Sequence, residues 1–408
     1  VFNSQDVILN AGALVIEPFI SNAAGTASEI ASGARAQALF ATNIFVRGDA
    51  TLGNNGQAQY TRIANLTIAN DPNAPVMNGN GVISLALQSG LWVRGTTTLA
   101  PEARINSSFN GLSQSTFEGV VTGTGRIEKF GNGAITMLNP GNNYGGGTII
   151  WGTTNATAVS TVASAYRGVG TPFSTGDIQI QPGGLLRIAD NANIDSNAVY
   201  LRSDGYGLGG LGLAHNSVLN LASFITSGTP TAGQIKVESS GPFAGVIALD
   251  YGYYSQPLNM AAIPGGDWWL GNSQQNDSYY FNSTLGAADS GKFLLGGGGN
   301  QGSLQIGSVL VSATRTSLFE NVLTGGTANQ VKVEIGAQTG DFVGNSPTFV
   351  NGNSGYVALT TRNLGLIGDV RVNTNTTLGL GNNFALGNGR LVFNGGGIRY
   401  DIGNNNYL

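Results

Sequence analysis

The sequence predicts an all-β fold, a parallel β-helix (β-solenoid) in which one chain winds through successive coils whose short strands pair from coil to coil. Three observations support this prediction. Short stretches with an apolar residue at every second position recur along the 408 residues, as expected of half-buried strands. Turns rich in Gly, Asn and Pro separate these stretches. The chain also has 64 Gly and only 10% charged residues, against about 25% in an average soluble domain, so amides and hydroxyls must supply much of its polar surface.

The expected strands come in pairs around a short turn. The first pair runs through Val7 and Leu9, a turn, and then Leu14 and Ile16. The same layout returns at residues 44–52, 91–99, 178–188, 370–380 and 391–400. Sandwiches and propellers also use short strands, but a solenoid explains why Gly or Asn recurs at each bend, where φ is positive. At roughly 20–25 residues per coil the chain would make about 16–20 coils, a rod of about 80–95 Å at a strand spacing of ~4.8 Å.

We expect residues 1–408 to form a single solenoid with two interruptions. Thr26 and Glu29 match a capping box before an Ala-rich stretch, which predicts a helical excursion at residues 26–40 and allows at most one or two short helices in all. Residues 224–302 concentrate aromatic side chains and end in a run of glycines, which predicts irregular aromatic-rich loops or an embedded lobe.

Composition argues against several classes of function. A net charge of −4 leaves no basic surface for a nucleic-acid partner. No stretch approaches the ~20 apolar residues of a membrane span. With no Cys, and His215 as the one His, the chain lacks a thiolate metal site and has little scope for Ser–His or Cys–His catalysis. We therefore expect no enzyme activity, no cofactor and no metal.

Two glycine-rich motifs fall short of established binding sites. Residues 205–210 match Gly-x-Gly-x-x-Gly, but the helix that a dinucleotide site requires does not follow, so we interpret them as a turn. Residues 209–215 lack the Asp of the calcium-binding nonapeptide, because Ala214 stands at its position. Carboxylates that might hydrolyse a glycoside show no recognisable spacing; they are Asp190, Asp195, Asp204, Asp250, Asp267 and Asp277.

Residues 121–152 carry the most specific motif in the chain, with paired glycines, a lysine, and an Asn-x-Tyr before a Thr-Ile strand. Its defining positions are Gly123, Gly125, Lys129, Gly131, Gly133, Asn142, Tyr144, Gly146 or Gly147, Thr148 and Ile149. The segment resembles the autotransporter-associated β-strand repeat, and residues 176–188 and 383–400 resemble it more loosely. The resemblance implies a right-handed parallel β-helix, extracellular and exposed on a bacterial cell surface.

Aromatic residues between positions 224 and 302 are the candidate interaction residues. Tyr and Trp supply large contact areas at low entropic cost in protein interfaces and sugar-binding platforms. They can equally fill the core of an irregular lobe, and the sequence leaves both interpretations open. The candidates are Tyr251, Tyr253, Tyr254, Trp268, Trp269, Tyr279 and Tyr280.

The two ends of the predicted solenoid suggest a function. A β-helix exposes strand edges at both ends, and neither end of this sequence shows a capping segment or a run of charges. Because residue 1 is Val, we expect a mature or excised segment whose export signal has been removed. Uncapped ends should pair with neighbouring segments of a longer chain or with copies of the same chain, head to tail. The second arrangement gives a filament if the contact does not close into a ring.

We therefore expect a structural subunit of an extracellular bacterial fibre, sheath or surface layer that self-assembles through its uncapped ends. The alternative is a glycan-binding or glycan-cleaving β-helix of the adhesin or tailspike type. That alternative predicts surface glycans as partners, bound in a groove with paired carboxylates beside Trp268 and Trp269.

Overall fold

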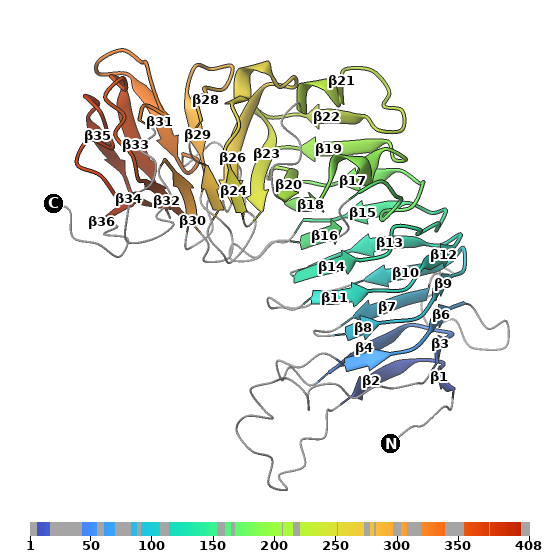
Figure 1. Cartoon of the computed structure of the whole chain (residues 1–408). Helices are drawn as coiled ribbons and strands as arrows, with labels where there is room; N and C mark the ends of the chain where they lie inside the picture. Colours follow the sequence, from blue (N-terminus) through green and yellow to red (C-terminus); the bar gives the residue numbers. More distant parts are fainter. Residues whose placement is uncertain are drawn as a thin grey trace, which may run out of the picture. The chain divides into compact units, whose positions relative to one another are not determined.

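A computed structural model gives the fold of the chain (Figure 1). It describes residues 6–16, 43–54, 61–69, 83–87, 91–106, 114–131, 133–152, 160–164, 168–205, 207–214, 221–250, 252–272, 278–280, 283–296, 303–307, 320–338, 355–374 and 376–400. The predicted helix at residues 26–40, His215, Tyr251 and Asp277 lie outside these ranges. The chain divides into two compact units, which we describe separately. The first comprises residues 1–151, 160–179 and 192–198, and the second comprises residues 152–159, 180–191 and 199–408.

The first unit is built from three parallel sheets, to which successive coils contribute their strands. One sheet has the order β1 (Val7–Leu9), β3 (Ile44–Val46), β6 (Leu66–Ile68), β9 (Thr97–Leu99) and β12 (Val121–Gly123). The second has the order β2 (Gly12–Ile16), β4 (Ala50–Asn54), β7 (Ile83–Leu87), β10 (Ala103–Asn106), β13 (Arg126–Lys129), β15 (Thr148–Ile150) and β17 (Ile178–Ile180). The third has the order β5 (Thr61–Ile63), β8 (Leu91–Val93), β11 (Gln114–Phe117), β14 (Gly133–Met137) and β16 (Ser160–Ser164).

The second unit is also built from parallel sheets. Its longest run is β18 (Gly184–Ile188), β20 (Gly210–Ala214), β23 (Phe243–Asp250), β26 (Asp267–Asn272), β29 (Phe293–Leu295), β31 (Val331–Ile335), β33 (Asp369–Asn373) and β35 (Leu391–Asn394). Beside it lie β24 (Gly252–Tyr254), β27 (Ser278–Tyr280), β30 (Ser303–Ile306), β32 (Gly355–Leu359), β34 (Thr376–Leu380) and β36 (Gly397–Tyr400). Shorter groups are β19 (Val199–Ser203), β22 (Ile235–Ser239) and β21 (Ile225–Thr226), and the pair β25 (Leu258–Asn259) and β28 (Leu285–Gly286).

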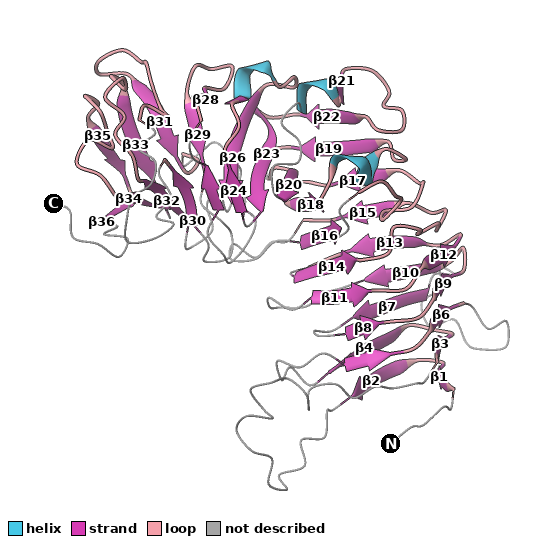
Figure 2. Cartoon of the chain, viewed as in Figure 1, coloured by secondary structure: helices cyan, strands magenta, loops and turns pink. Residues whose placement is uncertain are grey.

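Helical structure is confined to single 3₁₀ turns among the described residues (Figure 2). These are η1 (Asn191–Ile194), η2 (Leu221–Ser223) and η3 (Met260–Ala262). Strand pairings among the described residues are parallel, and apart from that of β21 with β22 they join strands that are not consecutive in the chain. The predicted all-β, parallel β-helical fold class is confirmed.

Coil length varies more than the sequence predicts. Ile83 pairs with Ala103 and Thr377 with Gly397, steps of 20 residues. By contrast, Phe293 pairs with Val333, a step of 40 residues. Parallel pairing continues across these long steps, as the pairing of β29 with β31 shows. The chain therefore makes fewer coils than a uniform length of about 20–25 residues would predict.

The core of each unit consists of columns of apolar side chains that stack from coil to coil. In the first unit, Val46 pairs with Ile68, which pairs with Leu99, and all three are fully buried. Their neighbours along each strand point outward, as the period of two requires. The alternation seen in the sequence thus selects the side chains that form the core.

Gly123 shows why a coil needs glycine where two turns stack. Its φ is +103°, and a Cβ at this position would lie 2.0 Å from the carbonyl oxygen of Leu99 in the preceding coil. Gly12 has a similar φ of +96°, but a Cβ there would meet no heavy atom within 4 Å. Both glycines therefore need a positive φ, but only Gly123 also lacks the space for a Cβ atom.

We predict that Gly123→Ala destabilises the protein by about 2 kcal/mol or more beyond Gly12→Ala. Both substitutions force an L-residue into the left-handed region, at a cost of roughly 1–2 kcal/mol, but only Gly123→Ala also pushes two coils apart. Urea unfolding of the two variants measures the difference. Equal losses of stability would show that the coils are not in close contact at this turn.

Candidate functional site

Four of the seven candidate aromatic residues are buried in the second unit. Trp268 and Trp269 on β26 have no exposed surface, and Tyr254 and Tyr280 are only 2% and 1% exposed. These residues fill the core, which is the second of the two interpretations that the sequence left open. They are too deeply buried to form an exposed platform. Tyr279 is half-buried.

Specific contacts hold these aromatic side chains in the core. Trp268 donates from its indole nitrogen to the carbonyl oxygen of Pro264 at 3.1 Å. Trp269 makes an edge-on contact with Phe243, with 5.4 Å between ring centroids. The hydroxyl of Tyr280 accepts from the Leu258 amide at 3.0 Å, and burial raises the pKa of Tyr280 to about 12.

The backbone of this aromatic region follows the same parallel register as the other coils. Tyr253 on β24 pairs with Tyr279 on β27, and Tyr254 pairs with Tyr280. Strand β23 pairs with β20 and with β26. Residues 224–302 therefore contribute strands to the sheets of the second unit.

Two of the acidic candidates accept hydrogen bonds from backbone amides, one within its own turn and one from a residue 23 positions along the chain. Asp204 accepts a hydrogen bond from the Gly207 amide at 2.9 Å, and Asp267 accepts one from the Ser290 amide at 2.8 Å. Within the described ranges, no group of three His, Cys, Asp or Glu side chains could hold a metal ion. None of the helices in those ranges has the length and apolar character of a membrane span.

Buried asparagines link three successive coils where strand pairing is interrupted. In the first unit, Asn142 is 1% exposed. Its Oδ1 accepts from the amide of Val121 at 2.8 Å, and its Nδ2 donates to the carbonyl oxygen of Pro172 at 2.7 Å. One side chain thus satisfies a donor in the coil before it and an acceptor in the coil after it. Because a buried polar group without a partner costs roughly 1–3 kcal/mol, this arrangement supports both neighbouring coils.

The second unit repeats this arrangement at Asn363, which is fully buried. Its Oδ1 accepts from the Leu323 amide at 3.0 Å, and its Nδ2 donates to the carbonyl oxygen of Ala385 at 2.8 Å. Asn142 was visible in the sequence as part of a motif, but its role was not predicted. Any Asn side chain can make the same hydrogen bonds as a peptide group, so the sequence does not show which Asn residues link neighbouring coils.

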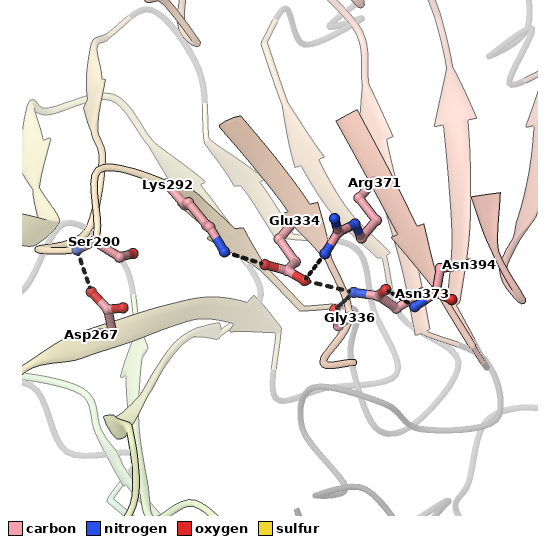
Figure 3. Close-up of polar contacts among 8 residues, drawn as sticks. All are labelled: Asp267, Ser290, Lys292, Glu334, Gly336, Arg371, Asn373 and Asn394. Atoms are coloured by element: carbon pink, nitrogen blue, oxygen red, sulfur yellow. Dashed lines mark hydrogen bonds and ion pairs between the residues drawn. The ribbon is translucent and has the colours of Figure 1, made fainter. Parts of the chain in front are cut away.

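A polar ladder runs along the second unit and centres on Glu334 (Figure 3). Glu334 is 3% exposed and lies between Lys292 at 3.3 Å and Arg371 at 3.7 Å. It also accepts from Nδ2 of Asn373 at 3.1 Å, and Oδ1 of Asn373 accepts from Nδ2 of Asn394 at 2.9 Å. The ladder crosses from β31 through β33 to β35, so it ties the last described coil to the two before it.

Lys129 is a second buried polar residue that was visible in the sequence without a predicted role. It has no exposed surface, and its Nζ donates to the carbonyl oxygens of Phe130 at 2.6 Å and Gly131 at 2.8 Å. Burial lowers the pKa of Lys129 to about 7. The amine satisfies the carbonyls of the turn between β13 and β14, where the motif places Gly131.

The last described coil leaves its apolar columns open. In one column Ile335 pairs with Val372, which pairs with Phe393; the first two are fully buried, whereas Phe393 is 51% exposed. Leu378 is fully buried beneath Ile398, which is 40% exposed. In the described residues, β35 pairs only with β33, and β36 only with β34. We call the surface formed by β35 and β36 the open edge.

No family model, no curated protein and no solved structure matches this chain. The site therefore has to be interpreted from its own geometry. That geometry consists of buried amides that join coils and of apolar columns that end at the open edge.

Replacing Asn363 by Asp should destabilise the protein strongly at neutral pH, by about 3–5 kcal/mol. A carboxylate cannot donate to Ala385, and burial next to a carbonyl oxygen raises its pKa above the unfolded value of about 3.9. Stability should therefore be highest below pH 4 and fall as the pH rises through the folded pKa. Urea unfolding between pH 3 and 8 measures this, with Asn388→Asp as the control, because the side chain of Asn388 is exposed and donates to the carbonyl oxygen of Leu364 at 3.4 Å.

Lys129 should make the stability of the wild-type chain rise between pH 7 and pH 10. The unfolded lysine, with a pKa near 10.4, keeps its proton over this range, whereas the folded lysine does not, so unfolding takes up a proton. The slope approaches about 1.4 kcal/mol per pH unit. Unfolding experiments across this range should show the rise in the wild type and in Lys236→Met but not in Lys129→Met; a rise that survives in Lys129→Met would assign it to another group.

Proposed function

We propose that this chain is a structural subunit of an extracellular bacterial fibre, sheath or surface layer, assembled by adding coils along the solenoid axis. The observation that carries the proposal is the open edge. Phe393 and Ile398 continue columns that are fully buried in the coils beneath them, yet both are exposed. A further coil stacked on β35 and β36 would remove their apolar surface from water, a gain of roughly 25 cal/mol per Å².

Backbone groups at the open edge support the same proposal. The outer N–H and C=O groups of β35 and β36 meet no further strand among the described residues. Exposed edges of this kind pair with another strand unless they are blocked by charge, proline or a covering segment. The edge strands carry a single charged residue, Arg399, which lies over the ring of Tyr356 at 4.8 Å.

The interior of the protein suits a load-bearing role. Each coil adds backbone hydrogen bonds that run along the axis, and Asn142 and Asn363 replace such bonds where strands end. The buried Trp268 and Trp269 are unavailable as a sugar-binding surface, so the glycan-handling alternative loses the residues on which it depended. The extracellular, bacterial location rests on the resemblance of residues 121–152 to the autotransporter-associated repeat.

The proposal predicts concentration-dependent assembly of the 408-residue chain, which sedimentation velocity and negative-stain electron microscopy measure. Phe393→Asp combined with Ile398→Asp should leave a folded monomer, because both side chains are already exposed and the charges oppose stacking of an apolar coil. Val169→Asp is the control, since Val169 is 83% exposed and lies in the first unit. A wild-type chain that remains monomeric across the concentration series contradicts the proposal.

A further inference from the structure

The first and last described coils have the same strand–turn–strand layout. Residues 7–16 read VILNAGALVI and residues 391–400 read LVFNGGGIRY. Aligned without a gap, both have apolar residues at positions 1, 3, 8 and 10, Asn at position 4 and small residues at positions 5 to 7. In both, one strand precedes the small residues and a second begins within them: β1 and then β2 (from Gly12) in the first coil, β35 and then β36 (from Gly397) in the last.

In both coils the apolar columns are covered by a neighbouring coil on one side only. Val7 and Leu9 pair with Ile44 and Val46, which are 2% and 0% exposed, yet Val7 and Leu9 are only half-buried. Their columns are therefore covered on one side only. The columns of the last coil are likewise covered on one side, by β33 and β34.

Charged residues just before the two coils have opposite signs. Arg390 precedes Leu391 and forms an ion pair with Asp369 at 2.6 Å, while its side chain stays 62% exposed. Asp6 precedes Val7 in the equivalent position and is exposed. Stacking the first coil on the last would place Arg390 between two carboxylates, Asp369 below and Asp6 above.

The asparagine at position 4 provides a further match. Asn373 and Asn394 occupy it in the last two coils, and their amides are hydrogen-bonded to each other at 2.9 Å (Figure 3). Asn10 occupies it in the first coil. Asn10 of a second copy would therefore extend the ladder that begins at Glu334.

We propose that the open edge binds the first coil, Val7–Ile16, of a second copy of this chain in parallel register. Leu391 lies beside Val7 of the second copy, Asn394 beside its Asn10, and Ile398 beside its Leu14. This inference rests on the proposed function and names the surface and the register that axial assembly would use. The contact joins two different surfaces and repeats from copy to copy, which generates a filament when the rotation between copies does not close into a ring.

The absence of cysteine from the sequence allows the register to be tested by cross-linking. Neighbouring strands lie about 4.8 Å apart, within the roughly 4.4–6.8 Å range of Cα separations that a disulfide spans. We expect the double variant Asn10→Cys/Asn394→Cys to form a ladder of disulfide-linked oligomers under mild oxidation. A mixture of the two single variants should stop at the heterodimer, because each copy then has one cysteine. Asn10→Cys mixed with Asn388→Cys is the matched control and should not cross-link, since Asn388 is exposed but outside the predicted register.

The outcomes separate the inference from the proposed function. Filaments in the microscope without the Asn10–Asn394 cross-link would overturn the register and leave axial assembly standing. Cross-linking of Asn394→Cys alone into homodimers would indicate tail-to-tail contact and would also overturn the inference. A chain that neither assembles nor cross-links, although circular dichroism shows it to be folded, would reject both.

A charge reversal provides a second test that does not depend on disulfide geometry. Asp6→Lys should weaken association about tenfold, because it sets a positive charge beside Arg390 in the stacked coils. Asp195→Lys makes the same change of net charge at an exposed site in η1–β19 and should have no effect. Equal effects of the two variants, measured by sedimentation, would show that Asp6 does not face Arg390.

Discussion

The fold depends on one constraint: the backbone groups of each coil must find their hydrogen-bond partners in the neighbouring coils. Buried peptide groups without partners are too costly to tolerate in number. Where two strands stack, the ladder satisfies them directly. Where strand pairing stops, a buried side chain takes over, as Asn142 does for Val121 and Pro172. Asn363 does the same in the second unit, so both units use this arrangement.

The few charged residues also link neighbouring coils. Glu128 in the first unit is 4% exposed and meets Arg104 at 3.2 Å and Arg126 at 3.3 Å, one from the preceding coil and one from its own. Glu334 in the second unit also meets two cations, Lys292 in the preceding coil and Arg371 in the following coil. A buried carboxylate contributes little net stability even when it is paired, but losing a partner is expensive. Such residues therefore disfavour a slipped register, in which the cations would be displaced by one or more positions.

The burial of the aromatic residues changes which part of the protein is proposed to be functional. Adjacent residues of a strand point to opposite faces, so the burial of both Trp268 and Trp269 means that β26 is covered on its two sides. Pro264 lies within hydrogen-bond distance of one indole, and Phe243 contacts the other ring. A sequence that places two Trp side by side does not reveal whether the second face is covered by the same chain or by a partner. The functional proposal accordingly moves from these residues to the open edge, where exposed apolar side chains are observed.

The sequence by itself determined the all-β class, the pairing of short strands around turns and the identity of many core residues. These properties are local: a period of two and a glycine at a bend are visible within about ten residues. Only the tertiary structure decided which strands stack, because segments of very different length separate them, as the steps from Ile83 to Ala103 and from Phe293 to Val333 illustrate. It also decided the roles of Asn363, Lys129 and Glu334. The partners that link Asn363 and Glu334 to neighbouring coils lie 22 to 42 positions away, beyond the reach of any local pattern.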